Sequence, residues 1–244
     1  IDITHGPLLA ARLFCFADEP LARLFVSIHH LAVDGVSWRV LLEDLHAAYH
    51  GQPLSEKTTS FREWALHLQQ LARSPAIGDE APLWQALLSQ DVEPMPVDYP
   101  AAGAAHNAVG DSASVSFELD EAETAALLRR LPRAYETRIN NVLLVALAQA
   151  CSMVTGNART RIDVESHGRH VCDAPIDVSR TVGWFTSIYP IVLEVDARQT
   201  PQQALRDAQQ QLRRIPAEGL GYSLLRYLGP DDAVRDSLAA LPNA

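Results

Sequence analysis

Two adjacent histidines, His29 and His30, end an apolar stretch and are followed after three residues by Asp34-Gly35. Neighbouring side chains that leave a strand point to opposite sides, so at most one imidazole can face a given site while the other faces packing. A histidine pair by itself is more often structural. However, an aspartate beside a glycine at a loop-to-helix junction can accept backbone N–H groups or pair with a distant arginine. Such contacts would fix the loop that presents one titratable imidazole.

Two further stretches carry groups that could bind or react. Residues 163–170 hold two acidic residues, two histidines and an arginine at the end of a predicted strand, and taken alone this pattern is typical of a solvated loop. Residues 180–190 contain Gly183, Trp184 and Phe185 and, taken alone, indicate a buried strand with aromatic packing.

Metal and hydrolase chemistry are poorly supported by the sequence. Adjacent histidines rarely converge on one ion, no HExxH pattern occurs, and no third partner can be named for His167 and His170. We therefore assign no metal ligand. Ser37 lacks the second glycine of a nucleophile elbow, and glycine-rich phosphate loops are absent from the sequence.

The elements that must position these residues begin with a predicted antiparallel pair, residues 8–16 and 22–29, joined by a turn at residues 17–20. From Asp34 the apolar residues recur at helical spacing as far as Tyr49. The next expected elements are a helix capped by Ser60 with Glu63 and a helix over residues 80–88. They are followed by a strand at Val115, Phe117 and Leu119, a helix whose start Asp120 and Glu123 mark, and a buried helix over residues 140–155 that Gly156 ends. The last are strands over residues 161–165 and 182–195 and a helix over residues 200–214, which Thr200 opens with proline in its first turn.

Residues 91–111 interrupt this order with three prolines and no periodicity, and they are the best linker candidate. Strands and helices are mixed on both sides of the linker, which predicts two α/β lobes. The chain opens on Ile1 without an initiator methionine and ends abruptly after a helical stretch. We therefore expect it to be truncated at both ends.

Composition excludes several classes of protein. The chain has 244 residues, of which 48% are apolar, and a formal net charge of −10, so it is an ordinary globular protein and neither nucleic acid nor an anionic membrane is an expected partner. Cys15, Cys151 and Cys172 are an odd number without CxxC spacing, which points to a reduced compartment, with neither a disulfide framework nor a zinc site. No apolar run reaches the roughly 18 residues of a membrane span. We expect a cytoplasmic protein.

The three stretches together resemble a known family. The histidine loop with residues 36–45 resembles the condensation-domain superfamily of nonribosomal peptide synthetases, and specifically its epimerization domains. Residues 165–170 are similar to that family's Glu-Gly-His-Gly-Arg-Glu, residues 180–190 to its Arg-Thr-Val-Gly-Trp-Phe-Thr block, and residues 216–223 to the next block in order. The resemblance covers essentially the whole chain, with Ser166 and His170 replacing the usual glycine and glutamate.

The resemblance implies an α/β fold, of the α+β two-layer type, in which two chloramphenicol acetyltransferase-like lobes form a V with the active site at their junction. Residues 1–95 would be the latter part of the N-terminal lobe, 96–112 the linker and 113–244 the C-terminal lobe. The first part of the N-terminal lobe and the final Phe-Asn-Tyr-Leu-Gly block of the family would be missing.

The activity implied is epimerization of an L-aminoacyl or peptidyl thioester, carried on the 4'-phosphopantetheine of a peptidyl carrier protein, to the D form. A thioester acidifies its α-proton, and inversion needs one group to remove that proton and another to return one from the opposite face. His30 and Glu165 would be the catalytic pair, with the pKa of Glu165 raised by burial or by a neighbour. The domain would bind no cofactor and no metal, and its partners would be the carrier protein and the adjacent synthetase domains.

Supporting roles are assigned as hypotheses. Because Asp34 and Arg169 each lie beside an expected catalytic residue, we expect them to pair and hold the histidine loop against the second lobe. His29 would be structural, and Gly35 would belong to the loop. The expected substrate and phosphopantetheine channel residues are Trp38, His167, Gly183, Trp184, Ser187 and Tyr222.

Two alternatives stay open. A condensation domain would use the same histidine loop to form a peptide bond, although that group lacks the Glu165 to Arg169 pattern. A truncated chain could instead be an inactive carrier-docking or scaffold fragment.

Overall fold

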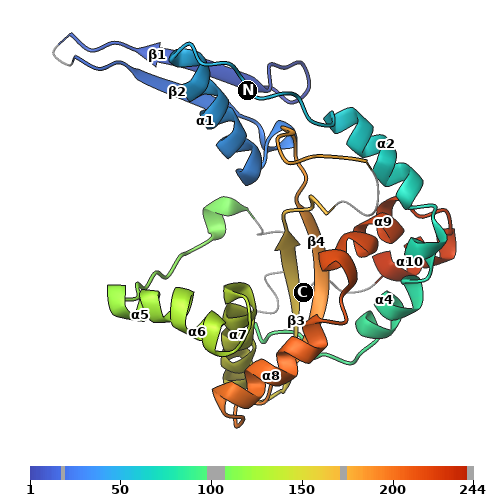
Figure 1. Ribbon diagram of the computed structural model, residues 1–244. Helices are drawn as coiled ribbons and strands as arrows, with labels where there is room; N and C mark the ends of the chain where they lie inside the picture. The colour runs from blue at the N-terminus through green and yellow to red at the C-terminus, as the bar shows by residue number, and fades with distance from the viewer. Residues whose placement is uncertain (18–19, 98–107, 171–174, 241–244) are drawn as a thin grey trace. The chain divides into compact units, whose positions relative to one another are not determined.

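The chain contains both strands and helices, as Figure 1 shows for the computed structural model, which describes residues 1–17, 20–97, 108–170 and 175–240. The mixed fold class predicted from the sequence is confirmed. The chain divides into two compact units, each built from segments that are distant in the sequence. Unit 1 comprises Ile1–Pro82, Glu165–Tyr189 and Ala217–Ala239, and unit 2 comprises Leu83–Val164 and Pro190–Pro216.

The lobe boundaries predicted at residues 95 and 113, and the arrangement of the two lobes, stay predictions. Most of the predicted linker, residues 98–107, lies outside the described residues. The same holds for Cys172 and for residues 18–19 of the first predicted turn, whereas Cys15 and Cys151 are free thiols.

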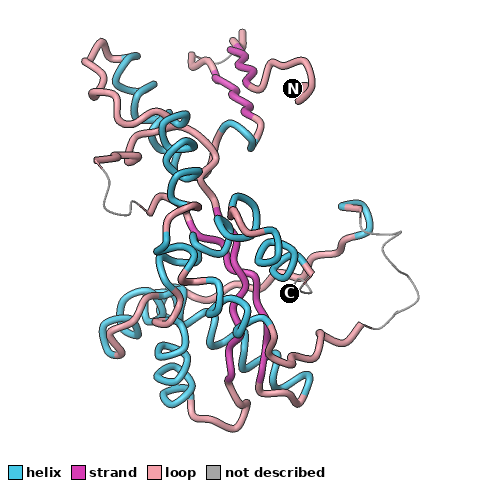
Figure 2. The backbone as a smooth tube through the Cα atoms, turned by 90° about the vertical axis from the view of Figure 1, so that its right-hand side faces the viewer, coloured by secondary structure: helices cyan, strands magenta, loops and turns pink. Residues whose placement is uncertain are grey.

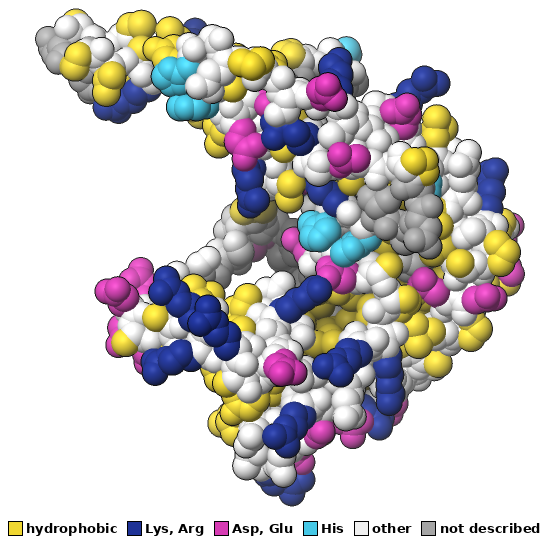
Figure 3. Space-filling model, viewed as in Figure 1, with side chains coloured by type: hydrophobic (Ala, Val, Ile, Leu, Met, Phe, Trp, Pro, Cys, Tyr) yellow, Lys and Arg dark blue, Asp and Glu magenta, His cyan; other side chains and the backbone are white. Residues whose placement is uncertain are grey.

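Unit 1 begins with a β-hairpin that confirms the first predicted pair. Strands β1 (Leu9–Phe14) and β2 (Arg23–Ile28) are antiparallel, with Leu9 opposite Ile28. The pairing fixes where β2 ends, and therefore where the histidine loop begins. Apolar side chains lie on the surface of this hairpin (Figure 3).

A short 3-10 helix, η1 (His30–Ala32), and helix α1 (Gly35–Tyr49) follow the hairpin. Asp34 is the N-cap of α1, because its side chain accepts a hydrogen bond from the backbone N–H of Ser37. Gly51 takes the left-handed conformation just after the helix, with φ +67°. The predicted helix after the histidines is thus confirmed, together with the residues that end it.

The remaining helices of unit 1 pack against one another. Helix α2 (Phe61–Leu71) starts with the predicted reciprocal cap between Ser60 and Glu63. Helix α2 and the short α3 (Pro75–Gly78) pack on α9 (Leu220–Leu228), which also contacts α10 (Asp232–Ala239). Helix α10 is the helical stretch expected near the end of the chain, whereas α3 and α9 were not among the elements predicted from the sequence. Helix α4 (Ala81–Leu88), most of which belongs to unit 2, confirms the helix expected over residues 80–88.

Unit 2 is mostly helical. The predicted cap of Asp120 with Glu123 is present at the start of α5 (Glu121–Ala125), which continues through a π-helical turn, residues 126–130, into α6 (Leu131–Ala134). Helix α8 (Pro201–Leu212) starts with Thr200 capping and proline in its first turn, as expected. A single 3-10 turn, η4 (Val109–Asp111), precedes these helices.

Two predictions about unit 2 were wrong. Residues 113–120 form no strand: Val115 is 97% exposed, and without a neighbouring strand the alternating pattern has no ladder to join. Helix α7 (Ile139–Thr155) ends at Gly156 as predicted but is not fully buried. Helices α6 and α8 pack against it, yet Met153 and Val154 remain more than 70% exposed. The apolar composition of α7 therefore led to a wrong prediction of its burial.

Among the described residues no single helix is long and apolar enough to cross a membrane. One pair of helical segments reaches that length and composition when taken together, namely residues 121–134 and 139–155. The two segments are bent by 104° at their junction.

Strands β3 (Arg159–Ser166) and β4 (Ser187–Glu194) lie side by side in both ribbon and tube views (Figures 1 and 2). Strand β3 confirms the strand expected over residues 161–165. Strand β4 starts five residues later than predicted, because the backbone N–H groups of Gly183 and Phe185 bond to side chains near the start of α1 and join no ladder. The segment before β4 is thereby tied to the histidine loop.

A small hydrophobic core supports that segment. Trp64 of α2 packs with Val178 and Phe185, and partly buried Leu68 and Ile176 extend the cluster. Gly168 fits beside this segment only because it lacks a side chain: its φ is +65°, and an added Cβ would lie 1.7 Å from the carbonyl oxygen of Phe185.

We predict that Gly168→Ala lowers the free energy of unfolding by more than about 3 kcal/mol, since it combines left-handed strain with a backbone clash. Gly51→Ala is the matched control, because Gly51 has nearly the same φ and nothing within 4 Å of an added Cβ, so it should cost only about 1 kcal/mol. Urea denaturation of both variants measures the difference. Equal losses would show that the close approach at Gly168 is relieved by local movement.

Candidate functional site

The candidate site is centred on the carboxylate of Asp34, whose residue is 4% exposed. Its Oδ1 accepts the N–H of Ser37 at 2.7 Å, and its Oδ2 accepts the N–H of Phe185 at 3.2 Å. The guanidinium of Arg169 donates to both oxygens, at 3.1 and 3.2 Å. The ion pair hypothesised between Asp34 and Arg169 is therefore present, and both residues belong to unit 1.

Arg169 makes more contacts than an ion pair alone requires. One guanidinium nitrogen donates to the carbonyl oxygens of Val178 and Thr181, at 2.6 and 2.8 Å, while the other reaches Asp34. The guanidinium carbon lies 3.8 Å from the centre of the Phe185 ring, which is a cation–π contact. Arg169 thus ties the loop after β3 to residues 178–185 and to the start of α1.

Ser37 completes this network from the first turn of α1, where it is fully buried. Its hydroxyl oxygen accepts the N–H of Gly183 and one N–H of Arg169, both at 3.1 Å, and its hydroxyl donates to the carbonyl oxygen of Gly183 at 2.9 Å. The Ser37 hydroxyl therefore donates one hydrogen bond and accepts two, which is all that a hydroxyl can make, and its partners lie in two segments that are distant in the sequence.

The electrostatics of Asp34 follow from these contacts. Burial acts to raise the pKa of its carboxyl, but the hydrogen bonds from Ser37, the charge of Arg169 and the N–H of Phe185 together outweigh burial. The pKa of Asp34 is therefore lowered, and the carboxylate stays ionised beside Arg169.

The two histidines of the loop have different environments. His29 is half-buried, and its Nδ1 accepts the N–H of Leu31 at 3.1 Å, so this ring helps to shape the loop. His30 is exposed, and its ring lies edge-on to Trp184 with 5.3 Å between the ring centres. Within unit 1, His30 is the more exposed imidazole of the pair.

Glu165 lies near the end of β3 and is exposed. Among the described residues no hydrogen bond or ion pair joins Glu165 to His30. The structure thus brings the two sequence stretches together through Asp34 and Arg169, but it does not place the two expected catalytic side chains in contact. The burial expected for Glu165 is not seen either.

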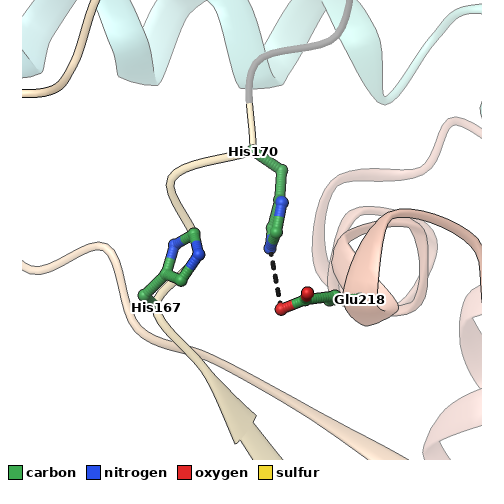
Figure 4. A group of neighbouring side chains, drawn as sticks. All are labelled: His167, His170 and Glu218. Atoms are coloured by element: carbon green, nitrogen blue, oxygen red, sulfur yellow. Dashed lines mark ion pairs between the residues drawn. The ribbon is translucent and has the colours of Figure 1, made fainter. Parts of the chain in front are cut away.

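The loop after β3 forms a second polar cluster (Figure 4). The rings of His167 and His170 are stacked with 4.5 Å between centres, and His170 Nε2 lies 3.2 Å from the carboxylate of Glu218. Ser166 Oγ lies within 3.2 Å of both His170 and Glu218. Burial and the nearby charge of Glu218 raise the pKa of Tyr189.

The other residues expected at the site have varied surroundings. Gly183 packs so closely that an added Cβ would lie 2.2 Å from the ring of Phe61, whereas nothing lies within 4 Å of a Cβ added to Gly35. Ser187 is buried, and its hydroxyl has no hydrogen-bond partner among the described residues. The remaining two are Trp38, half-buried on α1, and Tyr222, buried with its hydroxyl oxygen accepting a hydrogen bond from Arg226.

Sequence reasoning missed Ser37 as part of the site. Its position three residues after Asp34 is the N3 position of a helix capped by an aspartate, and that spacing was the available signal. It also missed Arg180, which pairs with Glu43 at 2.9 Å and with Asp44. These contacts of Arg180 are a second link between α1 and residues 178–185.

Comparison with known proteins adds independent findings. The family model described as "Condensation domain" matches residues 1–238. One of the linear gramicidin synthase proteins of Brevibacillus parabrevis is 41% identical over 247 residues, which are 99% of this chain and 5% of that protein. Bacitracin synthase 3 of Bacillus licheniformis is 37% identical over 98% of this chain and 4% of its own length. The chain thus spans about a twentieth of these relatives.

Two solved structures of related domains also match the chain. The epimerization domain from the third module of tyrocidine synthetase B matches with a TM-score of 0.86 and 37% identity, over 95% of this chain and 53% of that one. The first condensation domain of the calcium-dependent antibiotic synthetase matches with a TM-score of 0.65 at 16% identity, over 97% of this chain and 50% of that one. At 16% identity, the match to the condensation domain shows a similar fold only.

We predict that Asp34→Asn or Arg169→Met alone lowers the free energy of unfolding by about 3–5 kcal/mol, because each leaves a buried charge without its partner. The double variant should lose clearly less than the sum of the two. Guanidinium denaturation of the four proteins gives the coupling energy. Arg180→Met serves as a control at a more exposed ion pair and should cost much less. Additive losses at Asp34 and Arg169 would show that the pair is not coupled.

The lowered pKa of Asp34 also predicts a pH dependence. An aspartate with a folded-state pKa below its unfolded value of about 3.9 stabilises the fold above that value, and the contribution is lost as the pH falls through the folded-state pKa. The stability difference between the wild type and Asp34→Asn should therefore shrink as the pH is lowered below about 4. Denaturation midpoints from pH 6 to pH 2 measure it, and a constant difference would contradict the assignment.

Proposed function

The chain belongs to the condensation-domain family, and within that family we propose that it is an epimerization domain. Its substrate would be an L-aminoacyl or peptidyl group held as a thioester on the 4'-phosphopantetheine of a peptidyl carrier protein, and its product the D epimer. The observation that carries the proposal is the Glu165 to Arg169 loop, which Arg169 anchors beside the histidine loop through Asp34. The likeness to an epimerization domain at 37% identity supports the same assignment.

The proposed chemistry needs a base, an acid and a place for negative charge. The thioester carbonyl acidifies the Cα–H bond, Glu165 takes that proton, and the electron pair moves onto the thioester oxygen as an enolate. Return of a proton to the opposite face of Cα gives the D epimer, and His30 is the exposed imidazole that can donate it or stabilise the enolate. The mechanism uses no cofactor.

Because Glu165 is exposed, the proposal requires the arriving substrate to exclude water around its carboxyl. Removal of water raises the pKa of a carboxyl toward that of a useful base. The proposed substrate channel is lined by Trp38, His167, Gly183, Trp184, Ser187 and Tyr222. Exposed Trp184, which lies beside His30, would stand at the entrance of this channel. The partners would be the carrier protein and neighbouring synthetase domains, because the relatives are synthase proteins about twenty times as long as this chain.

Two other functions have specific support. Peptide-bond formation is favoured by the matching family model, which is described as a condensation domain. A carrier-docking role without catalysis is favoured by the exposed position of Glu165, which no hydrogen bond or ion pair joins to His30 among the described residues.

One assay separates the three functions. The chain is incubated in deuterated water with an L-aminoacyl carrier protein, with and without a second aminoacyl carrier protein as acceptor. Deuterium at Cα with D product supports epimerization, an amide product supports condensation, and carrier binding with neither product supports docking. Mass spectrometry and chiral chromatography of the released amino acid provide the readouts.

We predict that Glu165→Gln lowers the rate of α-deuteration at least about a hundredfold, because it removes the base. Asp163→Asn is the matched control, since it neutralises another exposed carboxylate on the same strand, and it should leave the rate within about twofold of the wild type. An undiminished rate in Glu165→Gln would exclude Glu165 as the base.

A further inference from the structure

The second polar cluster joins three side chains that can ligate a metal. His167 and His170 come from the loop after β3, and Glu218 comes from the turn before α9. One ligand atom from each lies within 4.8 Å of the others, and His170 Nε2 is 3.2 Å from a carboxylate oxygen of Glu218. Figure 4 shows His170 pointing toward Glu218 and the ring of His167 lying against that of His170. All three belong to unit 1.

The backbone around Glu218 holds this arrangement in an unfavourable conformation. Ala217 and Glu218 have φ values of 42° and 47°, in the left-handed region that residues with a side chain rarely adopt. Gly219 continues the turn at φ +79° and packs on Tyr189, with no room for a Cβ. Strained residues of this kind persist where the surrounding structure fixes them, and they concentrate at functional sites.

We propose that His167, His170 and Glu218 form a binding site for a borderline divalent cation, with Zn²⁺ as the best fit. Two imidazoles and one carboxylate are a ligand set that zinc accepts, and such a three-ligand set leaves a fourth position open. Ser166 Oγ donates to a carboxylate oxygen of Glu218 at 3.2 Å and is placed to orient that ligand, whereas its contact with His170 Nε2 would be replaced by the metal. The site goes beyond the proposed epimerization, which needs no metal.

Two competing interactions set the terms of binding. Protonated His170 forms an ion pair with Glu218, so a proton and a metal ion compete for the same Nε2 atom. His167 Nδ1 accepts the N–H of Arg169 at 3.0 Å, and this hydrogen bond is given up when the ring ligates a metal. A Zn²⁺ ion that binds here therefore has to displace both the proton on His170 and the hydrogen bond to His167.

The sequence did not indicate this site, because no third ligand could be named for the two histidines. Glu218 lies 52 residues after Ser166, on a turn whose left-handed conformation is not readable from its composition. Only the fold places the carboxylate beside the two rings.

Calorimetric titration of the full chain with Zn²⁺ tests the proposal. We expect one tight equivalent in the wild type, and at least a tenfold loss of affinity in His170→Ala and in Glu218→Gln. The control is the double variant His46→Gln/His50→Gln, which removes another pair of neighbouring rings, 4.5 Å apart on α1 and its C-cap, and should bind Zn²⁺ like the wild type.

Thermal unfolding and Co²⁺ absorption provide readouts that do not depend on activity. Zn²⁺ should raise the Tm of the wild type and the His46/His50 control but not that of Glu218→Gln, which keeps the size of the side chain if His170→Ala does not fold. Co²⁺ should give visible absorption bands that are lost in the same variants. Absence of saturable Zn²⁺ binding in the wild type, or its loss only in the His46/His50 control, would overturn the proposal.

Discussion

The buried contact of Arg169 with Asp34 is the interaction on which the rest of the site depends. A buried ion pair contributes little net stability, because removing two charges from water costs about as much as their attraction returns. What it contributes is position: the planar guanidinium meets both carboxylate oxygens while its other side holds the carbonyl oxygens of Val178 and Thr181. A lysine has one nitrogen and could not make these contacts at the same time.

Around this pair, side chains take over the role that a β-ladder usually has. The N–H groups of Gly183 and Phe185 bond to the side chains of Ser37 and Asp34. These bonds hold residues 180–186, the segment before β4, as an irregular strap across the start of α1. The strap carries Trp184, which meets His30, and its backbone closely approaches Gly168. The histidine loop, the loop after β3 and residues 180–186 are therefore one structural element, although they come from three parts of the chain.

The sequence predicted the local features of this element well. Caps, hairpin and helix starts depend on neighbouring residues. The capping pairs at Ser60 and Asp120 and the proline in the first turn after Thr200 were readable from spacing. The pairing of Asp34 with Arg169 was inferred because each lies beside an expected catalytic residue that the resemblance supplied, since spacing carries no information on contacts this distant. The exposure of α7, the missing strand at residues 113–120 and the partner of His170 depend on which surfaces meet, and no local pattern encodes that.

The distance between Asp34 and Arg169 along the chain has a consequence for biosynthesis. The two residues are 135 positions apart, so on a ribosome adding about 5–20 residues per second the aspartate is made roughly 7–27 seconds before its arginine exists. Until then its carboxylate must stay hydrated, and the loop bearing His30 lacks the strap that fixes it. The hairpin and α1 can form early from local signals, but the geometry of the histidine loop matures only with the later segments, which makes the site one of the last parts of the unit to assemble.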